Sequence, residues 1–123
     1  MKKIKLISLL ILLTSCSNDP MVRKNINNND ISVKWYYYSL ITNDSSDFID
    51  VRKGDSIVRI FESVNVITDI KITDKKIIIK QFEPSNGIIY TKKVLNEVFG
   101  YKIVIDSSAT YDEYRYRPAA KKE

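Results

Sequence analysis

Short runs in which apolar and polar residues alternate fill the chain from Ile31 onward and predict β-strands. The clearest is the run 66–73, where every second residue belongs to one face. Seven strands at this spacing, joined mostly by short connections, predict an all-β, mainly antiparallel fold, a small sandwich or a barrel-like meander. The predicted strands are residues 33–41, 48–53, 56–63, 66–73, 76–83, 88–94 and 101–106.

One hairpin register follows from the burial of isoleucines. Pairing Ile72 with Ile77 and Ile70 with Ile79 places all of them on one face, with the turn at 74–75. A two-residue loop over 74–75 and a four-residue loop over 73–76 give this same register.

Segments outside the strands carry other signals. Residues 95–100 predict a helical turn or a loop. Thr110 and Glu113 fit the Thr-x-x-Glu capping box, which predicts a short C-terminal helix over 111–117, with a final edge strand as the alternative. Residues 119–123 are predicted to be a frayed tail.

The first residues are typical of an export leader. Lys2, Lys3 and Lys5 precede an apolar run over 6–13, the order of a secretory signal peptide. The run is shorter than the roughly 20 residues that a membrane-spanning helix needs. Residues 1–15 are therefore predicted to be a signal peptide.

The leader ends with Leu13, Thr14, Ser15 and Cys16, the only cysteine of the chain. This stretch resembles the lipobox of bacterial lipoproteins. Membership of that class implies that Cys16 receives a diacylglycerol and that the leader is cut before it. Beyond this covalent lipid we expect no cofactor. Two or more acyl chains hold a protein stably on a membrane. An ordinary secretory leader with an incidental cysteine is the alternative.

The resemblance also implies a location in the bacterial cell envelope. Ser17 follows the cysteine, which by analogy with envelope lipoproteins predicts the outer membrane, with the domain facing the periplasm. Residues 16–30, polar and rich in asparagine, are predicted to form the lipidated N-terminus and a flexible tether. Residues 31–118 then form a single β-rich domain.

Composition narrows the chemistry. The formal charge of +5 includes three leader lysines, so the mature chain is nearly neutral and nucleic acid is not an expected partner. The chain has no histidine and three glycines, which removes the Ser-His-Asp mechanism, most zinc sites and a glycine-rich phosphate loop. We expect no bound metal and no enzyme activity.

The first loop is rich in carboxylates. Asp44, Asp47 and Asp50 could bind calcium, but their spacing is not that of an EF-hand, and a solvated loop with Asx turns is the favoured interpretation. A glycosidase site built from two carboxylates remains open, although no pair is marked.

The densest aromatic stretch is residues 35–38, Trp-Tyr-Tyr-Tyr. Strand alternation predicts that Trp35 and Tyr37 belong to the core, while Tyr36 and Tyr38 are candidates for contact with a partner.

A second cluster of aromatic and basic residues lies over 111–117. It is interpreted either as a docking patch for an acidic partner or lipid headgroups, or as a terminal segment that packs its tyrosines and leaves its arginines in water. The candidate binding residues are Tyr36, Tyr38, Tyr114, Arg115 and Arg117.

Three functions fit these observations. The first is a non-enzymatic envelope lipoprotein, a membrane-held module that binds an envelope protein or supports an assembly. The second is an inhibitor or immunity-type lipoprotein that acts against a lysozyme or toxin, although the cysteine pair and Ser/Gly-rich loop of lysozyme inhibitors are absent. The third is a carboxylate-based hydrolase.

Overall fold

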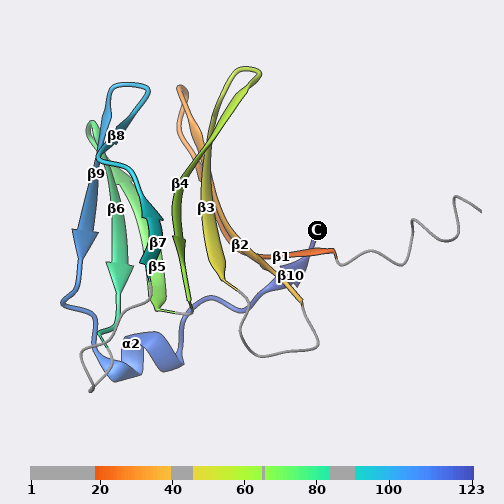
Figure 1. Ribbon diagram of the computed structural model, residues 1–123, viewed down its shortest axis with the longest axis vertical. Helices are drawn as coiled ribbons and strands as arrows, with labels where there is room; N and C mark the ends of the chain where they lie inside the picture. Colours follow the sequence, from red (N-terminus) through yellow and green to blue (C-terminus); the bar gives the residue numbers. More distant parts are fainter. Residues whose placement is uncertain (1–18, 40–45, 65, 84–90) are drawn as a thin grey trace, which may run out of the picture.

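The computed structural model describes residues 19–39, 46–64, 66–83 and 91–123, and within them two β-sheets face each other with one short helix at one end (Figure 1). This is the all-β sandwich that the alternating pattern predicts. Within the described ranges the sheets do not close into a barrel. Nor does any described helix have the length and apolar character needed to cross a bilayer.

The larger sheet has six strands in the order β10-β1-β2-β3-β4-β7, all paired antiparallel. Its strands are β1 (Pro20–Asn27), β2 (Ser32–Tyr38), β3 (Asp47–Lys53), β4 (Ser56–Ser63), β7 (Thr91–Val94) and β10 (Lys121–Lys122).

The smaller sheet has four strands in the order β5-β6-β9-β8. Its strands are β5 (Ile67–Thr73), β6 (Lys76–Gln81), β8 (Glu97–Val98) and β9 (Tyr101–Asp106). The helix α2 (Tyr111–Arg115) follows β9 and lies across the end of the sandwich (Figure 1).

The core fills the space between the two sheets. Alternate residues of β2, β3 and β4 face alternate residues of β5, β6 and β9, as strand periodicity requires. Burial of these side chains is the main source of stability in a domain without a disulfide. The core consists of Ile31, Val33, Trp35, Ile49, Val51, Ile60, Phe61, Ile67, Ile70, Ile77, Ile79, Val98, Tyr101 and Ile103.

The isoleucine register of the β5–β6 hairpin is confirmed. Ile70 pairs with Ile79 and Ile72 with Ile77. The predicted strands 56–63 and 101–106 match β4 and β9, and the other predicted strands shift by a few residues at their ends. Residues 40–41 of the first predicted strand and 88–90 of the sixth lie outside the described residues.

The flexible tether predicted over 16–30 is wrong for residues 20–27, which form β1. Pro20 pairs with Tyr38 at one end and Asn27 with Ser32 at the other. Backbone hydrogen bonds to β2 do not depend on side-chain polarity, so the polar sequence did not prevent strand formation. Ile26 also packs against the core, and Pro20 stands at the first position of the strand, where proline is tolerated.

Two further predictions fail near the end of the chain. The tail predicted over 119–123 contains β10, which pairs with the first residues of β1. Residues 95–100 contain β8 and a tight turn in place of the helical turn or loop. In that turn Phe99 (φ +50°) and Gly100 (φ +82°) both have positive φ, as a type I′ hairpin turn requires. Partial burial of Phe99 against the core offsets this unfavourable backbone. The short helix predicted over 111–117 is confirmed as α2.

The meander is interrupted by one parallel pair, β6 with β9. The connection between them is long enough for the crossover that a parallel pair needs. This connection contains β7, which joins the larger sheet, and β8, which forms an edge of the smaller sheet.

A polar cluster ties the hairpin turns of both sheets together at the end of the sandwich opposite α2 (Figure 1). The buried Tyr101 hydroxyl donates to Asp30 Oδ2 at 3.0 Å and accepts from Asn28 Nδ2 at 3.0 Å. Asp30 also pairs with Lys53 at 3.2 Å and Lys75 at 3.7 Å. The hydrogen bond from Lys53, and then that from Tyr101, lowers the pKa of Asp30.

Replacing Asp74 by glycine is expected to raise the free energy of unfolding by about 0.5–1 kcal/mol. Asp74 opens the β5–β6 turn at φ +52°, the backbone region that Gly54 adopts at φ +59° in the β3–β4 turn. Urea unfolding followed by circular dichroism measures the change. Gly54→Ala is the reciprocal control, because its new Cβ would meet no atom within 4 Å and only the backbone preference is lost. A loss of stability in Asp74→Gly would contradict the argument.

Candidate functional site

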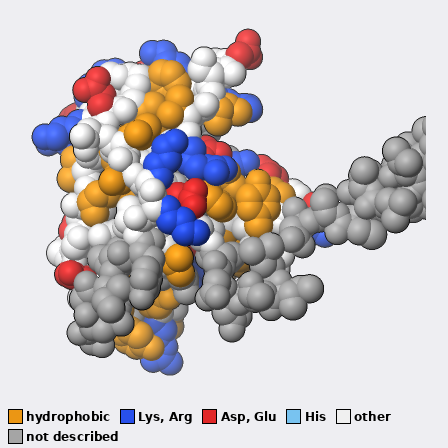
Figure 2. Space-filling model, in the orientation of Figure 1, with side chains coloured by type: hydrophobic (Ala, Val, Ile, Leu, Met, Phe, Trp, Pro, Cys, Tyr) orange, Lys and Arg blue, Asp and Glu red, His pale blue; other side chains and the backbone are white. Residues whose placement is uncertain are grey.

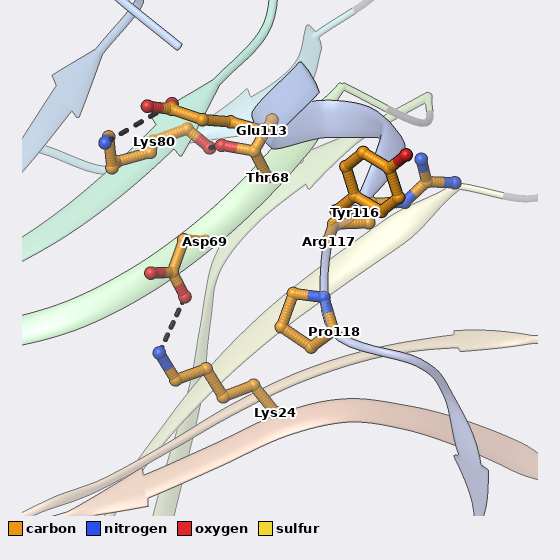
Figure 3. A pocket seen from close by; sticks show the side chains of 8 residues that line it. All are labelled: Lys24, Thr68, Asp69, Lys80, Glu113, Tyr116, Arg117 and Pro118. Carbon is orange, nitrogen blue, oxygen red and sulfur yellow. Dashed lines mark hydrogen bonds and ion pairs between the residues drawn. The ribbon is translucent and has the colours of Figure 1, made fainter. Parts of the chain in front are cut away.

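A groove of about 410 Å³ opens where the two sheets part beside α2 (Figure 3). It brings together β1 of the larger sheet, β5 and β6 of the smaller sheet, and the segment that leaves the helix. The groove is lined by Lys24, Thr68, Asp69, Lys80, Glu113, Tyr116, Arg117 and Pro118.

Two ion pairs cross the walls of this groove. Lys24 Nζ lies 2.6 Å from Asp69 Oδ1 and joins the two sheets. Lys80 Nζ lies 3.4 Å from Glu113 Oε2 and joins β6 to the helix. Both pairs are partly solvated, so each contributes at most about 1 kcal/mol to stability. Both carboxylates in the groove are therefore already matched by lysines.

The helix beside the groove is fixed in place by local bonds and ring contacts. Thr110 Oγ1 accepts from Glu113 N at 3.2 Å, and Glu113 Oε2 accepts from Thr110 N at 3.4 Å, which completes the predicted capping box. The rings of Tyr111 and Tyr114 pack against Phe82 at centroid distances of 5.8 and 5.4 Å. Glu113 thus both caps the helix and lines the groove.

Two tyrosines and one arginine on and just after the helix are open to solvent, as are the acidic residues Asp112 and Glu113. Tyr116 is 74% exposed and Tyr111 60% exposed. Arg115 is exposed as well, and its guanidinium carbon lies 5.3 Å from the Tyr116 ring centroid. We call Tyr111, Arg115 and Tyr116 the α2 face.

Asp47 is buried near two arginines, Arg23 and the groove residue Arg117. The Trp35 indole Nε1 donates to Asp47 Oδ2 at 3.1 Å. Burial raises the pKa of Asp47, and the hydrogen bond from Trp35 and the charges of Arg23 and Arg117 oppose that rise. Asp47 is only 3% exposed, so the prediction of a solvated loop is wrong for this residue.

Arg23 connects this cluster to the segment after α2. Its Nη1 donates to the carbonyl oxygen of Pro118 at 3.0 Å, and its guanidinium lies 5.0 Å from the Tyr37 ring centroid. Burial, followed by the nearby charge of Arg117, lowers the pKa of Arg23. Arg117 lies 4.2 Å over the Tyr114 ring and donates to the Tyr114 carbonyl at 3.0 Å.

Tyr36 is not available for contact, contrary to the sequence prediction. Alternation places it on the outer face of the larger sheet, but it is only 4% exposed. Its hydroxyl donates to Asp50 Oδ2 at 2.8 Å and accepts from Arg59 Nη2 at 2.9 Å. Its ring packs on Phe48 and Tyr38 at 5.5 and 5.7 Å. Burial and the Asp50 hydrogen bond raise the pKa of Tyr36 to about 12.

The surface of β4 and β7 near this cluster is charged. Glu62 lies 4.0 Å from Arg59 and 3.8 Å from Lys92. Figure 2 shows basic side chains around an acidic one in the middle of the view, with hydrophobic side chains beside them. The charges here are matched, as they are in the groove.

The predicted binding residues therefore separate into two places. Tyr36 and the half-buried Tyr38 belong to the outer face of the larger sheet. Tyr114 and Arg117 are half-buried beside the groove, and Arg115 is exposed on the α2 face. Cys16, the lipobox residues Leu13, Thr14 and Ser15, and also Asp44 lie outside the described residues.

Sequence reasoning missed the groove residues on the strands. Lys24 was assigned to the tether, and Asp69 and Lys80 carried no motif. Among the other groove residues, Glu113 had a signal in the capping box and Arg117 in the aromatic and basic cluster over 111–117. The groove depends on how β1 approaches β5, which local sequence does not specify.

Within the described ranges no three His, Cys, Asp or Glu side chains lie close enough together to hold a metal ion. Comparison with known proteins found no matching family model, no similar curated protein and no similar solved structure.

Proposed function

We propose that this protein is a lipid-anchored, non-enzymatic module of the bacterial cell envelope that binds a partner protein through the α2 face and the adjoining groove. The anchor is supported by the order of leader lysines, apolar run and Leu13-Thr14-Ser15-Cys16. Diacylglycerol on Cys16 would hold the chain on the membrane.

The observation that carries the binding proposal is the exposure of Tyr116, which lines the groove and contacts the Arg115 guanidinium, together with the exposure of Tyr111 on the same short helix. Tyrosine and arginine are enriched among residues that dominate binding at protein interfaces. Large apolar side chains exposed in a group often mark such interfaces.

The α2 face is also held rigid before any partner arrives. The capping box and the contacts of Tyr111 and Tyr114 with Phe82 fix the helix on the sandwich. A preorganised surface loses less conformational entropy on binding, so more of the contact energy appears as affinity.

The groove itself favours a protein partner. Lys24 with Asp69 and Lys80 with Glu113 present both signs of charge within one hollow. The mixed rim of a protein surface can match such a pattern, and charge complementarity of this kind supplies specificity.

The anchor is tested by Cys16→Ala in the full chain. We expect the variant to leave the membrane fraction, because the thiol that would carry the lipid is gone. Inhibition of signal peptidase II should retard the wild type, and not the variant, on a gel. A Cys16→Ala protein that stayed membrane-bound and showed no mobility difference would refute the lipid anchor.

The binding surface is tested by placing a photocrosslinking amino acid at position 116 in intact cells. We expect a covalent adduct with a specific protein, since Tyr116 is the most exposed aromatic residue described. The matched control carries the same group in place of Ile57, which is 54% exposed on the outer face of the larger sheet. Adducts of equal yield at both positions, or none at position 116, would count against the α2 face. A toxin or lysozyme in the adduct would select the inhibitor hypothesis.

A further inference from the structure

The start of β1 fixes how far the folded domain can stand from Cys16. β1 begins at Pro20, and Asp19 is held by Lys122 at an Oδ2–Nζ distance of 3.1 Å. Three peptide units connect Cys16 to Asp19, and they span at most about 11 Å. A long tether is therefore not available to the domain.

Two basic residues lie at this corner. β10 pairs Lys122 with Met21 and Lys121 with Val22, one strand spacing from β1. Both lysines are exposed, and the side chain of Lys122 keeps 71% of its surface accessible. Lys121 has no acidic partner among the residues that the structure describes.

Asp19 offsets the charge of Lys122, whereas the other acidic residue at this corner, Glu123, does not offset the charge of Lys121. Glu123 Oε1 binds Lys34 Nζ on β2 at 2.8 Å, so its charge is matched by the larger sheet. Its backbone N–H donates to the Pro20 carbonyl at 3.2 Å, which keeps the segment against β1. Among the described side chains, Lys121 and Lys122 against Asp19 leave one positive charge, that of Lys121, at the point where the chain leaves for Cys16.

From this placement we infer that the β1–β10 corner, with Lys121 and Lys122, rests on anionic phospholipid headgroups. The inference depends on lipidation of Cys16, which is part of the proposed function. A lipid on Cys16 sits at the headgroup layer, which is roughly 5–8 Å thick. The span to Asp19 is comparable with the Debye length of about 8 Å at physiological salt, so the lysines lie within the field of the bilayer.

The same geometry orients the domain. β1 runs away from the corner for eight residues, so the turns around Asp30 and Lys75 lie roughly 24 Å from Pro20. Lys76 and Lys102, which pair with each other beside these turns, are exposed far from the bilayer. They are internal controls for any reaction that reports contact with lipid.

The test is lysine labelling of the mature lipidated protein by a water-soluble acylating reagent, read by mass spectrometry of peptides. Vesicles of phosphatidylcholine with phosphatidylglycerol are compared with phosphatidylcholine alone and with neutral detergent micelles. We expect Lys121 and Lys122 to react about fivefold more slowly on the anionic vesicles, the factor that corresponds to the interaction of one lysine with an anionic surface. Lys76 and Lys102 should react equally in all three.

A variant with a longer linker tests whether the short connection to Cys16 is what holds the lysines at the headgroups. Twelve Gly/Ser residues inserted between Ser17 and Asn18 allow a mean separation of about 19 Å, so the protection should be largely lost. Equal reactivity of Lys121 and Lys122 in all three media, or equal protection on neutral and anionic vesicles, would overturn the inference while leaving the lipid anchor intact. An N-terminal peptide without the mass of diacylglycerol would instead refute the anchor.

Discussion

Replacing Trp35 by alanine is expected to lower the free energy of unfolding by about 4 kcal/mol. The side chain is fully buried in the centre of the core between Ile49 of β3 and Lys24 of β1 in the strand register. Truncation leaves a large cavity and removes the donor that bonds Asp47. A loss of this size is a large fraction of the stability of a small domain.

Urea unfolding followed by far-ultraviolet circular dichroism measures this loss. Tryptophan fluorescence does not serve here, because Trp35 is the only tryptophan of the chain and the variant lacks it. Trp35→Phe retains most of the ring volume and lacks the indole N–H, so it should lose about 1–3 kcal/mol. Ile57→Ala is the surface control, since that side chain is 54% exposed. A Trp35→Ala protein as stable as the Ile57→Ala protein would show that the indole is not the centre of the core.

Replacing Asp47 by alanine is expected to lower the free energy of unfolding by about 3 kcal/mol at neutral pH. The Trp35 N–H loses its acceptor in the core, and Arg23 and Arg117 lose the carboxylate that offsets their mutual repulsion. Asp47→Asn keeps an oxygen for the indole and should lose only about 1 kcal/mol.

The pH dependence of these variants has a defined sign. Burial raises the pKa of Asp47 in the folded protein above the unfolded value of about 3.9. The part of its contribution to stability that depends on protonation is therefore complete below about pH 4 and is lost as the pH rises through the folded pKa. The pKa values of Asp30 and Asp106 are lowered, so those residues act in the opposite direction.

Comparing wild type with Asp47→Asn across the pH range isolates this one residue, because both proteins contain Asp30 and Asp106. The stability difference should move in favour of Asp47→Asn as the pH rises above about 4. A difference that stayed constant with pH would mean that Asp47 has the same pKa in the folded and unfolded chains.

Local sequence patterns were sufficient to predict the structure where one face of a strand is buried and the other faces solvent. The β5–β6 register was predicted from the isoleucines, because a shift of the pairing by one residue would make their side chains face the solvent. The capping box located α2 for the same kind of local reason.

Long-range pairing was beyond these patterns. Half of the eight residues of β1 are polar and do not alternate with the apolar ones, and β10 consists of two lysines. Both segments are strands because a partner backbone lies beside them. Strand alternation assigned Tyr36 to the correct face of the larger sheet. Phe48, Tyr38 and the Arg59–Asp50 network cover that face, so the residue is buried there.

The candidate site was only partly foreseeable. Arg115 and Tyr114 were identified from composition, but the groove beside them depends on the approach of Lys24 to Asp69 across the two sheets. Asp47 had one signal that was not used, since a buried Trp35 needs an acceptor for its N–H.

The pairing of β1 with β10 also has a consequence for the order of folding. Met21 and Lys122 are about a hundred residues apart in the chain, although they are neighbours in the sheet. Because synthesis proceeds from the N-terminus, β1 is among the first strands to be made, and its outer neighbour is among the last. Contacts of such high sequence separation slow folding in small β-proteins. The larger sheet therefore gains its last strand after the rest of the sandwich can form, and until then the outer edge of β1 is open to pairing with another chain.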